Sequence, residues 1–312
     1  MSVHLAGVET PNRQGGWAPD VDRRLATLES PIRSVLEGHA SSLTAGDRIT
    51  LVPDTHYPFH PSSGMVTDPA VVGSIADRLS DWTDAEIGIA GATDDRIAFD
   101  RTAEYLGYPA IADRFDADLV DLADDDHRDT VVTVGDERVS IAVPERLLES
   151  TVVLVPTLRP TEDGPVSGGL RTLGRLVGSV ADADDAAVAA ERAVKPDLSV
   201  LDATIAYGGD PVAADALFAG PAAQIDAVGS SLLSRAVEED PVLRRTVEAA
   251  EESVTVESVT DEPAVDLASL RRRIPEGGLP PRDEVNPLVT TAYRVYAAVA
   301  GDAVPPQFTQ RR

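Results

Sequence analysis

The stretch Arg48-Ile-Thr-Leu-Val-Pro-Asp-Thr-His56 begins the pattern that decides the fold of this chain. Its first six residues are typical of a short buried strand, and a polar loop then leads to a helix that begins at Pro69. Residues 86–90, Glu-Ile-Gly-Ile-Ala, predict a second strand, and the helical crossover between the strands has the length of a βαβ unit. We therefore expect two parallel strands, with the loop after residue 53 at the sheet edge where open α/β proteins bind ligands.

The rest of the pattern extends this unit into an α/β body. Helices are predicted over residues 21–39 (with a kink or division at Pro31), 97–106, 144–150, 222–237, 241–251 and 283–300. Strands are predicted over 118–121, 151–155, 198–202 and 254–259, with a hairpin over 131–143. We expect a mostly parallel, Rossmann-like sheet with helices on both faces, in two closely joined halves of about 47–195 and 196–301. Residues 1–46 are expected to form an extended N-terminal segment and a helix ahead of the body (47–301), and residues 302–312 a loose tail.

Charge and composition are typical of a protein from a salt-loving archaeon. The 312 residues carry a formal net charge of -26 with 53 acidic residues, and Lys195 is the only lysine. Since 43% of the residues are hydrophobic, the chain has the apolar content of a folded protein rather than of a disordered acidic chain. A surface rich in Asp and Glu suits solubility in molar salt, where screening removes self-repulsion. In this background a single carboxylate is more often a solvated surface group than a catalytic one.

The same composition excludes several classes of partner and cofactor. Nucleic acids and anionic membrane surfaces are bound by patches of Lys and Arg, which this acidic chain does not provide. No stretch is typical of a signal peptide or a transmembrane helix, and we expect a cytoplasmic protein. Because the chain has no cysteine, disulfides, thiolate nucleophiles and cysteine-ligated iron–sulfur clusters are excluded. The sequence identifies no other cofactor and no oligomeric state.

Two of the five histidines lie in the loop after the first strand, close to an aspartate. Asp54, His56 and His60 are residue types that bind zinc, nickel or iron, and Asp54 and His56 are also catalytic candidates. Pro58 and Pro61 exclude a regular helix here, so helical periodicity does not place the two imidazoles on one face. The alternative is a surface turn that contains proline and histidine.

A glycine-rich segment, residues 164–175, is a candidate for anion binding. It combines a serine suited to cap a helix, two glycines that allow a ligand to approach the backbone, and two arginines four residues apart. The candidate ligand-binding residues are Ser167, Gly168, Gly169, Arg171 and Arg175. The segment matches neither the Walker nor the dinucleotide-binding glycine pattern. The alternative is a glycine-packed helix whose arginines pair with the acidic surface.

Asp226 is a third candidate, because it interrupts an otherwise small and apolar helix, residues 222–229. A carboxylate in such a position is costly to bury, which makes it a candidate for catalysis. Residues 207–211, Tyr-Gly-Gly-Asp-Pro, are in contrast typical of a turn rather than of a site.

Several stretches together resemble the domain-of-unknown-function 362 family. Thr67-Asp-Pro-Ala-Val71 is similar to the Thr-Asp-Pro-Glu-Val helix start of that family, and Val152-Val-Leu-Val-Pro156 to its central strand. Ser167-Gly-Gly-Leu-Arg-Thr-Leu-Gly174 lies where the family has Thr-Gly-x-x-Lys-Asn-x-x-Gly. Its Leu-Asp, Gly-Pro and Val-Asp-Ala-Val elements are resembled by Leu201-Asp202, Gly209-Asp-Pro211 and Ile225-Asp-Ala-Val-Gly229. The resemblance covers about residues 47–240.

The chain also departs from this family. The lysines are missing or replaced by Arg159 and Arg171, the asparagine is replaced by Thr172, and both the histidine after the central strand and the ferredoxin-like cysteines of some members are absent. Arginine stays protonated, so it can replace a lysine that contacts an anion but not one that acts as a base or Schiff-base partner. The loop Asp54-Thr-His-Tyr-Pro58 also resembles the Asp-x-Thr-Arg-Pro turn of the lactate racemase family, which would imply a nickel-pincer nucleotide.

The leading hypothesis is a protein that binds a small anionic metabolite or cofactor between its two halves, with or without catalysis. The loop 54–60, the helix start 167–175 and Asp226 are expected to face one cleft. One rival is a non-catalytic binding or scaffold protein that keeps the family fold, and a second is a metal-dependent enzyme distantly similar to lactate racemase. Convergence of the three segments favours the leading hypothesis, and dispersal favours the non-catalytic rival.

Overall fold

The computed structural model describes residues 2–9, 21–56, 59–94, 97–180, 182–247, 254–260, 262–275 and 278–279. The strands of the main sheet are β1 (Ser2–Gly7), β2 (Arg48–Pro53), β3 (Glu86–Gly91), β4 (Asp118–Asp121), β7 (Thr151–Val155), β8 (Leu198–Tyr207), β9 (Pro211–Gly220) and β10 (Thr255–Ser258). A separate ribbon pairs β5 (His127–Val134) with β6 (Glu137–Pro144).

The helices are α1 (Val21–Glu37), α2 (Ala40–Leu43), α3 (Pro69–Trp82), α4 (Phe99–Leu106), α5 (Tyr108–Arg114), α6 (Glu145–Glu149), α7 (Gly168–Gly174), α8 (Ala183–Val194), α9 (Ala222–Leu232), α10 (Pro241–Val247) and α11 (Leu267–Arg273). Two short 3-10 helices are η1 (Pro61–Ser63) and η2 (Val237–Glu239). None of these described helices is long and apolar enough to span a membrane.

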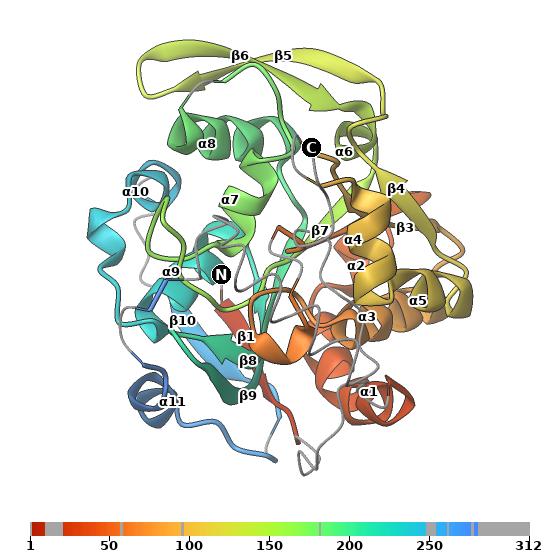
Figure 1. Cartoon of the computed structure of the whole chain (residues 1–312), viewed down its shortest axis with the longest axis vertical. Coiled ribbons are helices and arrows are strands. Elements are labelled where there is room, and N and C mark those ends of the chain that lie inside the picture. Colours follow the sequence, from red (N-terminus) through yellow and green to blue (C-terminus); the bar gives the residue numbers. More distant parts are fainter. Residues whose placement is uncertain are drawn as a thin grey trace, which may run out of the picture.

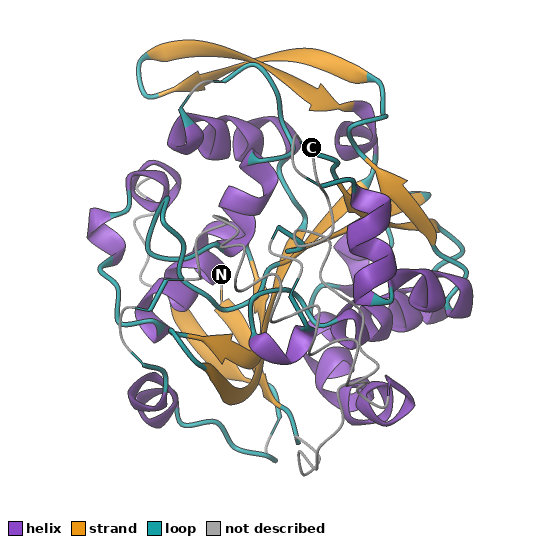
Figure 2. Cartoon of the chain, in the orientation of Figure 1, coloured by secondary structure: helices purple, strands orange, loops and turns teal. Residues whose placement is uncertain are grey.

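The main sheet has the strand order β10-β1-β9-β8-β7-β2-β3-β4, and helices flank it on both sides (Figure 1, Figure 2). Strand β9 runs antiparallel to both of its neighbours, and every other neighbouring pair is parallel. The predicted α/β class with a mostly parallel sheet and helices on both faces is therefore confirmed. The β5–β6 ribbon lies over α8 at one end of the molecule (Figure 1).

The strand–helix–strand unit predicted from the opening stretch is present. Strand β2 pairs in parallel with β3 on one side and with β7 on the other. Helix α3 begins at Pro69, and the side chain of Asp68 accepts a hydrogen bond from the Ala70 backbone N–H at 2.9 Å. This cap satisfies one of the N–H groups that the first turn of a helix leaves without a helical partner.

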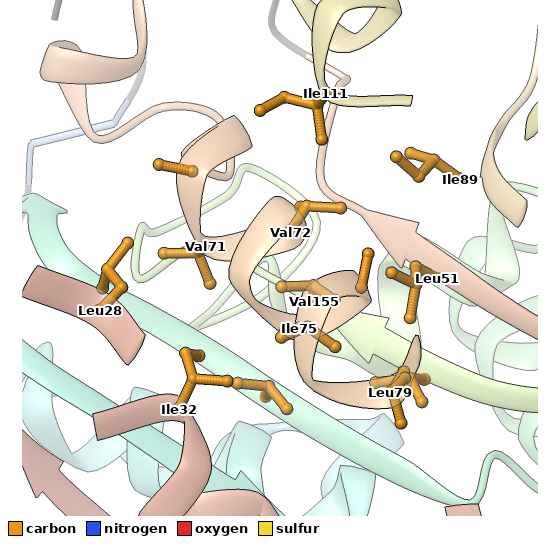
Figure 3. Close-up of a cluster of buried hydrophobic side chains, with 14 of the residues drawn as sticks. Leu28, Ile32, Leu51, Val71, Val72, Ile75, Leu79, Ile89, Ile111 and Val155 are labelled. Atoms are coloured by element: carbon orange, nitrogen blue, oxygen red, sulfur yellow. The ribbon is translucent and has the colours of Figure 1, made fainter. Parts of the chain in front are cut away.

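Alternating residues of the central strands supply the core on both faces of the sheet. Leu51 packs with α1 and α3, whereas its neighbour Val52 belongs to the core on the opposite face. Figure 3 shows the first of these cores, where α3 directs Val72 and Ile75 toward the sheet strands that carry Leu51 and Val155. Each fully buried side chain of this size contributes about 1.5–3 kcal/mol. This burial holds the strand ends of the parallel sheet in place.

The structure differs from the predicted elements at several positions. Residues 2–7, expected within an extended segment ahead of the body, form β1 inside the main sheet between β9 and β10. Strand β9 was not predicted, and α1 runs through Pro31 without a break. The helix predicted over 222–237 ends at Leu232. The helix predicted over 283–300 and the tail 302–312 lie outside the described residues.

Candidate functional site

A cleft of about 330 Å³ lies at the carboxyl ends of β2 and β3. Strands β3 and β4 lie on one side of β2 and strands β7 and β8 on the other, so the chain changes direction next to β2. Open α/β sheets bind ligands at such a point, outside the carboxyl ends of the strands. The cleft is formed by three segments: residues 52–56, the described residues 91–94 and 97–102, and the end of α7 at residues 172–176.

Beside this cleft, Asp54 forms a buried ion pair with Arg159, which follows strand β7. The Arg159 Nε and Nη2 atoms lie 3.1 and 2.8 Å from Asp54 Oδ2, and Nη2 also lies 3.1 Å from Oδ1. Both side chains are fully buried. The Ser167 hydroxyl donates a further hydrogen bond to Oδ2 at 3.0 Å, and the His56 backbone N–H donates to Oδ1 at 3.2 Å.

These contacts decide the charge of Asp54. Burial raises the pKa of the Asp54 carboxyl, but the positive charges of Arg159 and Arg175 and the hydrogen bond from Ser167 outweigh it, so the pKa lies below its ordinary value. The carboxylate is therefore ionised, and both of its oxygens already accept hydrogen bonds. Asp54 connects the end of β2 to Arg159 and Ser167, and it is not available as a proton donor at neutral pH.

The loop after β2 closes back on its own strand. The Asp54 backbone N–H donates to the Thr67 hydroxyl at 2.9 Å, and the Thr67 N–H donates to the Asp54 carbonyl at 3.0 Å. The same hydroxyl donates to the Val155 carbonyl at the end of β7. Both ends of the loop are thus tied to the edge shared by β2 and β7, which fixes Asp54 and the start of the cleft wall.

Arg175 brings a cationic group into the cleft from the end of α7. Its Nη2 atom lies 3.3 Å from Asp163, an aspartate whose side chain is 54% exposed. Its Nη1 atom is buried and has no hydrogen-bond partner among the residues that the structure describes. An ion pair with an exposed carboxylate is weak, about 0–1 kcal/mol. The guanidinium therefore keeps hydrogen-bonding capacity next to the cleft.

His56 lines the same cleft; part of the residue reaches solvent, but the protein atoms that surround the ring desolvate it. Desolvation of the ring and the positive charge of Arg175 lower the pKa of His56 to about 4, against the opposing effects of Asp54 and Asp94. The imidazole is therefore neutral at neutral pH. A neutral imidazole can both donate and accept a hydrogen bond, and it can accept a proton.

The third wall comes from the loop after β3, which was not singled out from the sequence. The Thr93 N–H donates to Asp121 at 2.9 Å, and the Thr93 hydroxyl accepts from the Phe99 N–H at 2.8 Å. A Cβ atom on Gly91 would lie 2.3 Å from a ring carbon of Phe99, so only glycine leaves room for that ring. The signal was available, because this loop leaves the predicted strand 86–90 at the same sheet edge.

The predicted helix-start site is occupied by the protein's own carboxylate. Asp226 accepts hydrogen bonds from the Gly169 N–H at 2.7 Å and the Leu170 N–H at 3.0 Å. A Cβ on Gly168 would lie 2.3 Å from Asp226 Oδ2, so the carboxylate packs closely against the backbone. Burial raises the pKa of Asp226 to about 7, against the lowering effect of the two hydrogen bonds. Ser167 does not cap α7, because its hydroxyl donates to Asp54 instead.

Arg171 does not share the cleft with Arg175. Its guanidinium is almost fully buried and donates to Asp240 at 2.8 and 2.9 Å and to Asp184 at 3.0 Å. These contacts join α7 to α8 and to the start of α10. Arg171 and Arg175, which were predicted together as ligand-binding residues, therefore have different partners in the structure: Asp240 and Asp184 for Arg171, and Asp163 for Arg175.

The three candidate metal ligands, Asp54, His56 and His60, do not all line the cleft. The Nδ1 atom of His60 accepts the Ser62 N–H at 3.2 Å and so caps η1, and His60 does not line the cleft. Among the described residues there is no group of three His, Cys, Asp or Glu placed to hold a metal ion. A metal on Asp54 would have to displace Arg159. Of the predicted positions, those that line the cleft are Asp54, His56 and Arg175.

Comparison with known proteins supports a family assignment. No curated protein matches the sequence significantly. A solved structure of a Thermotoga maritima protein is 15% identical with a TM-score of 0.41, and the alignment covers 65% of this chain and 57% of that one. The model of the family described as "Domain of unknown function (DUF362)" matches residues 49–230, more than half of the chain. The chain therefore belongs to the domain-of-unknown-function 362 family.

Proposed function

We propose that this protein binds a small anion in the cleft at the ends of β2 and β3, with Arg175 as the anchoring cation. The observation that carries this proposal is the buried Arg175 Nη1 atom, which lacks a hydrogen-bond partner within the described part of the chain. A buried donor without a partner costs about 1–3 kcal/mol. An anion would remove that cost if the guanidinium turns its buried Nη1 atom into the cleft that Arg175 lines. A guanidinium suits carboxylate and phosphate oxygens.

The remainder of the cleft fits such a role. The charges of Asp54 and Arg159 neutralise each other, and both side chains are fully buried. The pair therefore supports the cleft from below and does not compete with Arg175 for an anion. Thr55, Thr93 and Thr172 also line the cleft. The Thr93 and Thr172 hydroxyls already donate to Asp121 and to the Gly168 carbonyl, so of the three the Thr55 hydroxyl is the candidate donor to an anion. A volume of about 330 Å³ lies in the range of small-molecule sites, roughly 300–1,000 Å³.

Catalysis at this site would use His56 rather than the carboxylates. His56 lines the cleft, and its low pKa leaves the imidazole neutral at neutral pH, so it is a weak base that can exchange a hydrogen bond with a bound ligand. Asp54 and Asp226, the other predicted catalytic residues, are engaged by Arg159 and by the α7 backbone. Those internal contacts favour a second candidate function, a non-catalytic binding protein of the same fold.

Ligand binding by the full chain tests the proposal. Protein purified natively in molar potassium chloride is denatured, and the released small molecules are identified by mass spectrometry. Anions found there, and inorganic phosphate and acetate as simple probes, are then titrated calorimetrically into wild type and the Arg175→Ala variant. We expect binding to weaken about tenfold to hundredfold, because a hydrogen bond to a charged group is worth about 1.5–3 kcal/mol.

The matched control is Arg33→Ala. Arg33 is an exposed arginine on α1 that pairs with Glu29 at 2.9 Å. Its loss makes the net charge of -26 more negative by one unit, as Arg175→Ala does, but leaves the cleft unchanged, so anion affinity should equal that of wild type. Equal affinity in Arg175→Ala and Arg33→Ala, or no anion binding at all by wild type, would reject the proposed site.

A further inference from the structure

We infer that the ligand is a singly charged organic acid with an apolar end, of the class of small aliphatic or arylalkyl monocarboxylic acids. This inference rests on the binding function proposed above and specifies its ligand. It follows from three properties of the cleft: its charge, its apolar walls and its size.

The charge of the described cleft residues suits one negative charge. Among the residues that the structure describes, Arg175 is the only arginine or lysine that lines the cleft. Arg159, beneath it, is neutralised by Asp54 at 2.8 Å. A dicarboxylate or a phosphate dianion would bring a second charge toward the ionised Asp54 without a second described cation to receive it, and like charges at short range repel.

His56 does not supply a second positive charge. Its pKa of about 4 leaves the imidazole neutral over the range in which carboxylic acids are ionised. Protonation of His56 is opposed by the nearby Arg175 and Arg159. The same two arginines lower the pKa of Asp54, so the pair beneath the cleft stays ionised and compensated. Within the described part of the cleft, the positive charge available to a ligand at neutral pH is therefore that of Arg175.

Apolar side chains from two walls face the same cleft. Ile97 and Phe99 come from the loop and helix after β3, and Leu176 follows Arg175 at the end of α7. The Phe99 ring packs closely against Gly91, where a Cβ would lie 2.3 Å from a ring carbon. Burial of apolar ligand surface contributes about 25 cal/mol per Å². An apolar ligand group is therefore favoured beside the anion anchor, and a fully polar anion would leave these side chains in contact with water.

The size of the cleft restricts the ligand further. A volume of about 330 Å³ is near the lower end of the range for small-molecule sites, roughly 300–1,000 Å³. It suits a short acyl chain or a single ring. The chain also lacks a glycine pattern of the dinucleotide-binding type at residues 164–175.

A calorimetric panel with the full chain tests this inference. The probes are phenylacetate and hexanoate (apolar monoanions), succinate and inorganic phosphate (more highly charged), and phenylacetamide (the neutral counterpart of phenylacetate), all at neutral pH in molar potassium chloride. We expect phenylacetate or hexanoate to bind at least about tenfold more tightly than succinate, phosphate and phenylacetamide, because a tenfold ratio corresponds to 1.4 kcal/mol. Equal or tighter binding of phosphate or succinate overturns the inference.

Two variants test the apolar walls separately from the charge. Leu176→Asn and Ile97→Asn each place a polar group on a different wall, at residues that are only partly buried. We expect at least one of them to weaken phenylacetate binding about tenfold, since burying a polar group without a partner costs about 1–3 kcal/mol. Unchanged phenylacetate affinity in both variants overturns the inference.

The outcomes separate this inference from the proposed function. If phosphate binds, phenylacetate does not and Arg175→Ala abolishes phosphate binding, the anion site stands and its assignment to monocarboxylic acids is wrong. If no anion in the panel binds to wild type, both fail. If phenylacetate binds but Arg175→Ala binds it equally well, the ligand is held elsewhere and both assignments fail.

Discussion

Arg159 donates hydrogen bonds to both carboxylate oxygens of Asp54, in a fully buried pair whose members lie 105 positions apart in the chain. Asp54 directly follows strand β2, and Arg159 follows strand β7, which pairs in parallel with β2. The pair therefore connects β2 and β7 at the point where the order of the strands in the sheet reverses. The pair fixes the relative position of the two strand ends. It adds little net free energy of folding, because a buried ion pair gains little over apolar packing.

Replacement of Asp54 should strongly destabilise the protein. Asp54→Ala leaves the buried Arg159 charge without its counter-charge, and we expect the free energy of unfolding to fall by about 3–5 kcal/mol. Denaturant unfolding in molar potassium chloride measures this loss. Glu29→Ala, which removes an exposed partner of Arg33, is the control and should cost no more than about 1 kcal/mol. A loss for Asp54→Ala as small as that of the control would contradict the buried pair.

Arg171 and Arg175 should respond in opposite ways to the same substitution. Arg171→Met breaks buried ion pairs with Asp240 and Asp184, so we expect a loss of about 3–5 kcal/mol in unfolding free energy with anion affinity retained. Arg175→Met removes only a weak ion pair to the exposed Asp163, so we expect a loss of at most about 1 kcal/mol together with loss of anion binding. Unfolding and calorimetry on both variants compare the two quantities. Loss of anion binding in Arg171→Met with binding retained in Arg175→Met would instead place the anion site at Arg171.

The local elements of the fold were predictable because their signals are local. The strand 48–53, the helix from Pro69 and the strand 86–90 each carry periodicity and boundary residues within a few positions. Strand β9 carries no such signal, because four of its residues are alanines, which have low strand propensity. It is a strand because it pairs with β1 and β8. Strand β1 is likewise recognisable only through its partners, which lie more than two hundred positions away.

The candidate site was predictable only in part, for the same physical reason. Position in the chain placed Asp54 and His56 at a ligand-binding edge, and both line the cleft. The cost of burying Asp226 was also evident, but its partners, the Gly169 and Leu170 N–H groups, are more than fifty positions away. Partners that meet only in the folded chain leave no spacing pattern, which is why the helix start was taken for an anion site.

Asp226 should give the protein a distinctive pH dependence. Its pKa is raised to about 7 in the folded state, so between about pH 4 and 7 the folded protein binds more protons here than the unfolded chain. The contribution of Asp226 to stability is therefore most favourable below its unfolded pKa of about 3.9, and it is lost as the pH rises through 7. Asp226→Asn carries no titrating group, so the difference in unfolding free energy between wild type and this variant should fall over that range and level off above it.

Unfolding of both proteins from pH 4 to 9 in molar potassium chloride measures this difference. Asp136→Asn, at an exposed position in the turn of the β5–β6 ribbon, is the control and should follow the pH profile of wild type. A constant difference between wild type and Asp226→Asn across the range would show that the Asp226 carboxyl is ionised throughout.

Salt should stabilise the protein over a wide concentration range. A net charge of -26 makes the folded chain self-repelling at low ionic strength, and the Debye length falls from about 30 Å at 0.01 M to about 3 Å at 1 M. We expect the midpoint of thermal unfolding to rise steeply as potassium chloride increases from dilute to molar. A sugar osmolyte that stabilises without screening provides the comparison at low salt. A flat profile with potassium chloride would contradict the adaptation to high salt inferred from composition.

The hydroxyl of Tyr108 provides a final test of the buried polar network behind the site. Tyr108 is fully buried, and its hydroxyl has no hydrogen-bond partner within the described ranges of the chain. Burial and the negative charges of Asp68, Asp202 and Asp54 raise the pKa of Tyr108, so the hydroxyl stays protonated. An unsatisfied buried hydroxyl costs about 1–3 kcal/mol, so Tyr108→Phe should leave the unfolding free energy unchanged or raise it by up to that amount.

Tyr207→Phe is the comparison, because the Tyr207 hydroxyl donates to the Leu279 carbonyl at 3.4 Å and its removal should cost a fraction of a typical hydrogen bond. Denaturant unfolding of the two variants gives the ranking. If Tyr108→Phe proves less stable than wild type by more than Tyr207→Phe, the Tyr108 hydroxyl must have a bound partner in solution. An ordered water between Tyr108 and the carboxylates of Asp68 and Asp202 would supply one, because such a water satisfies several buried polar groups at once.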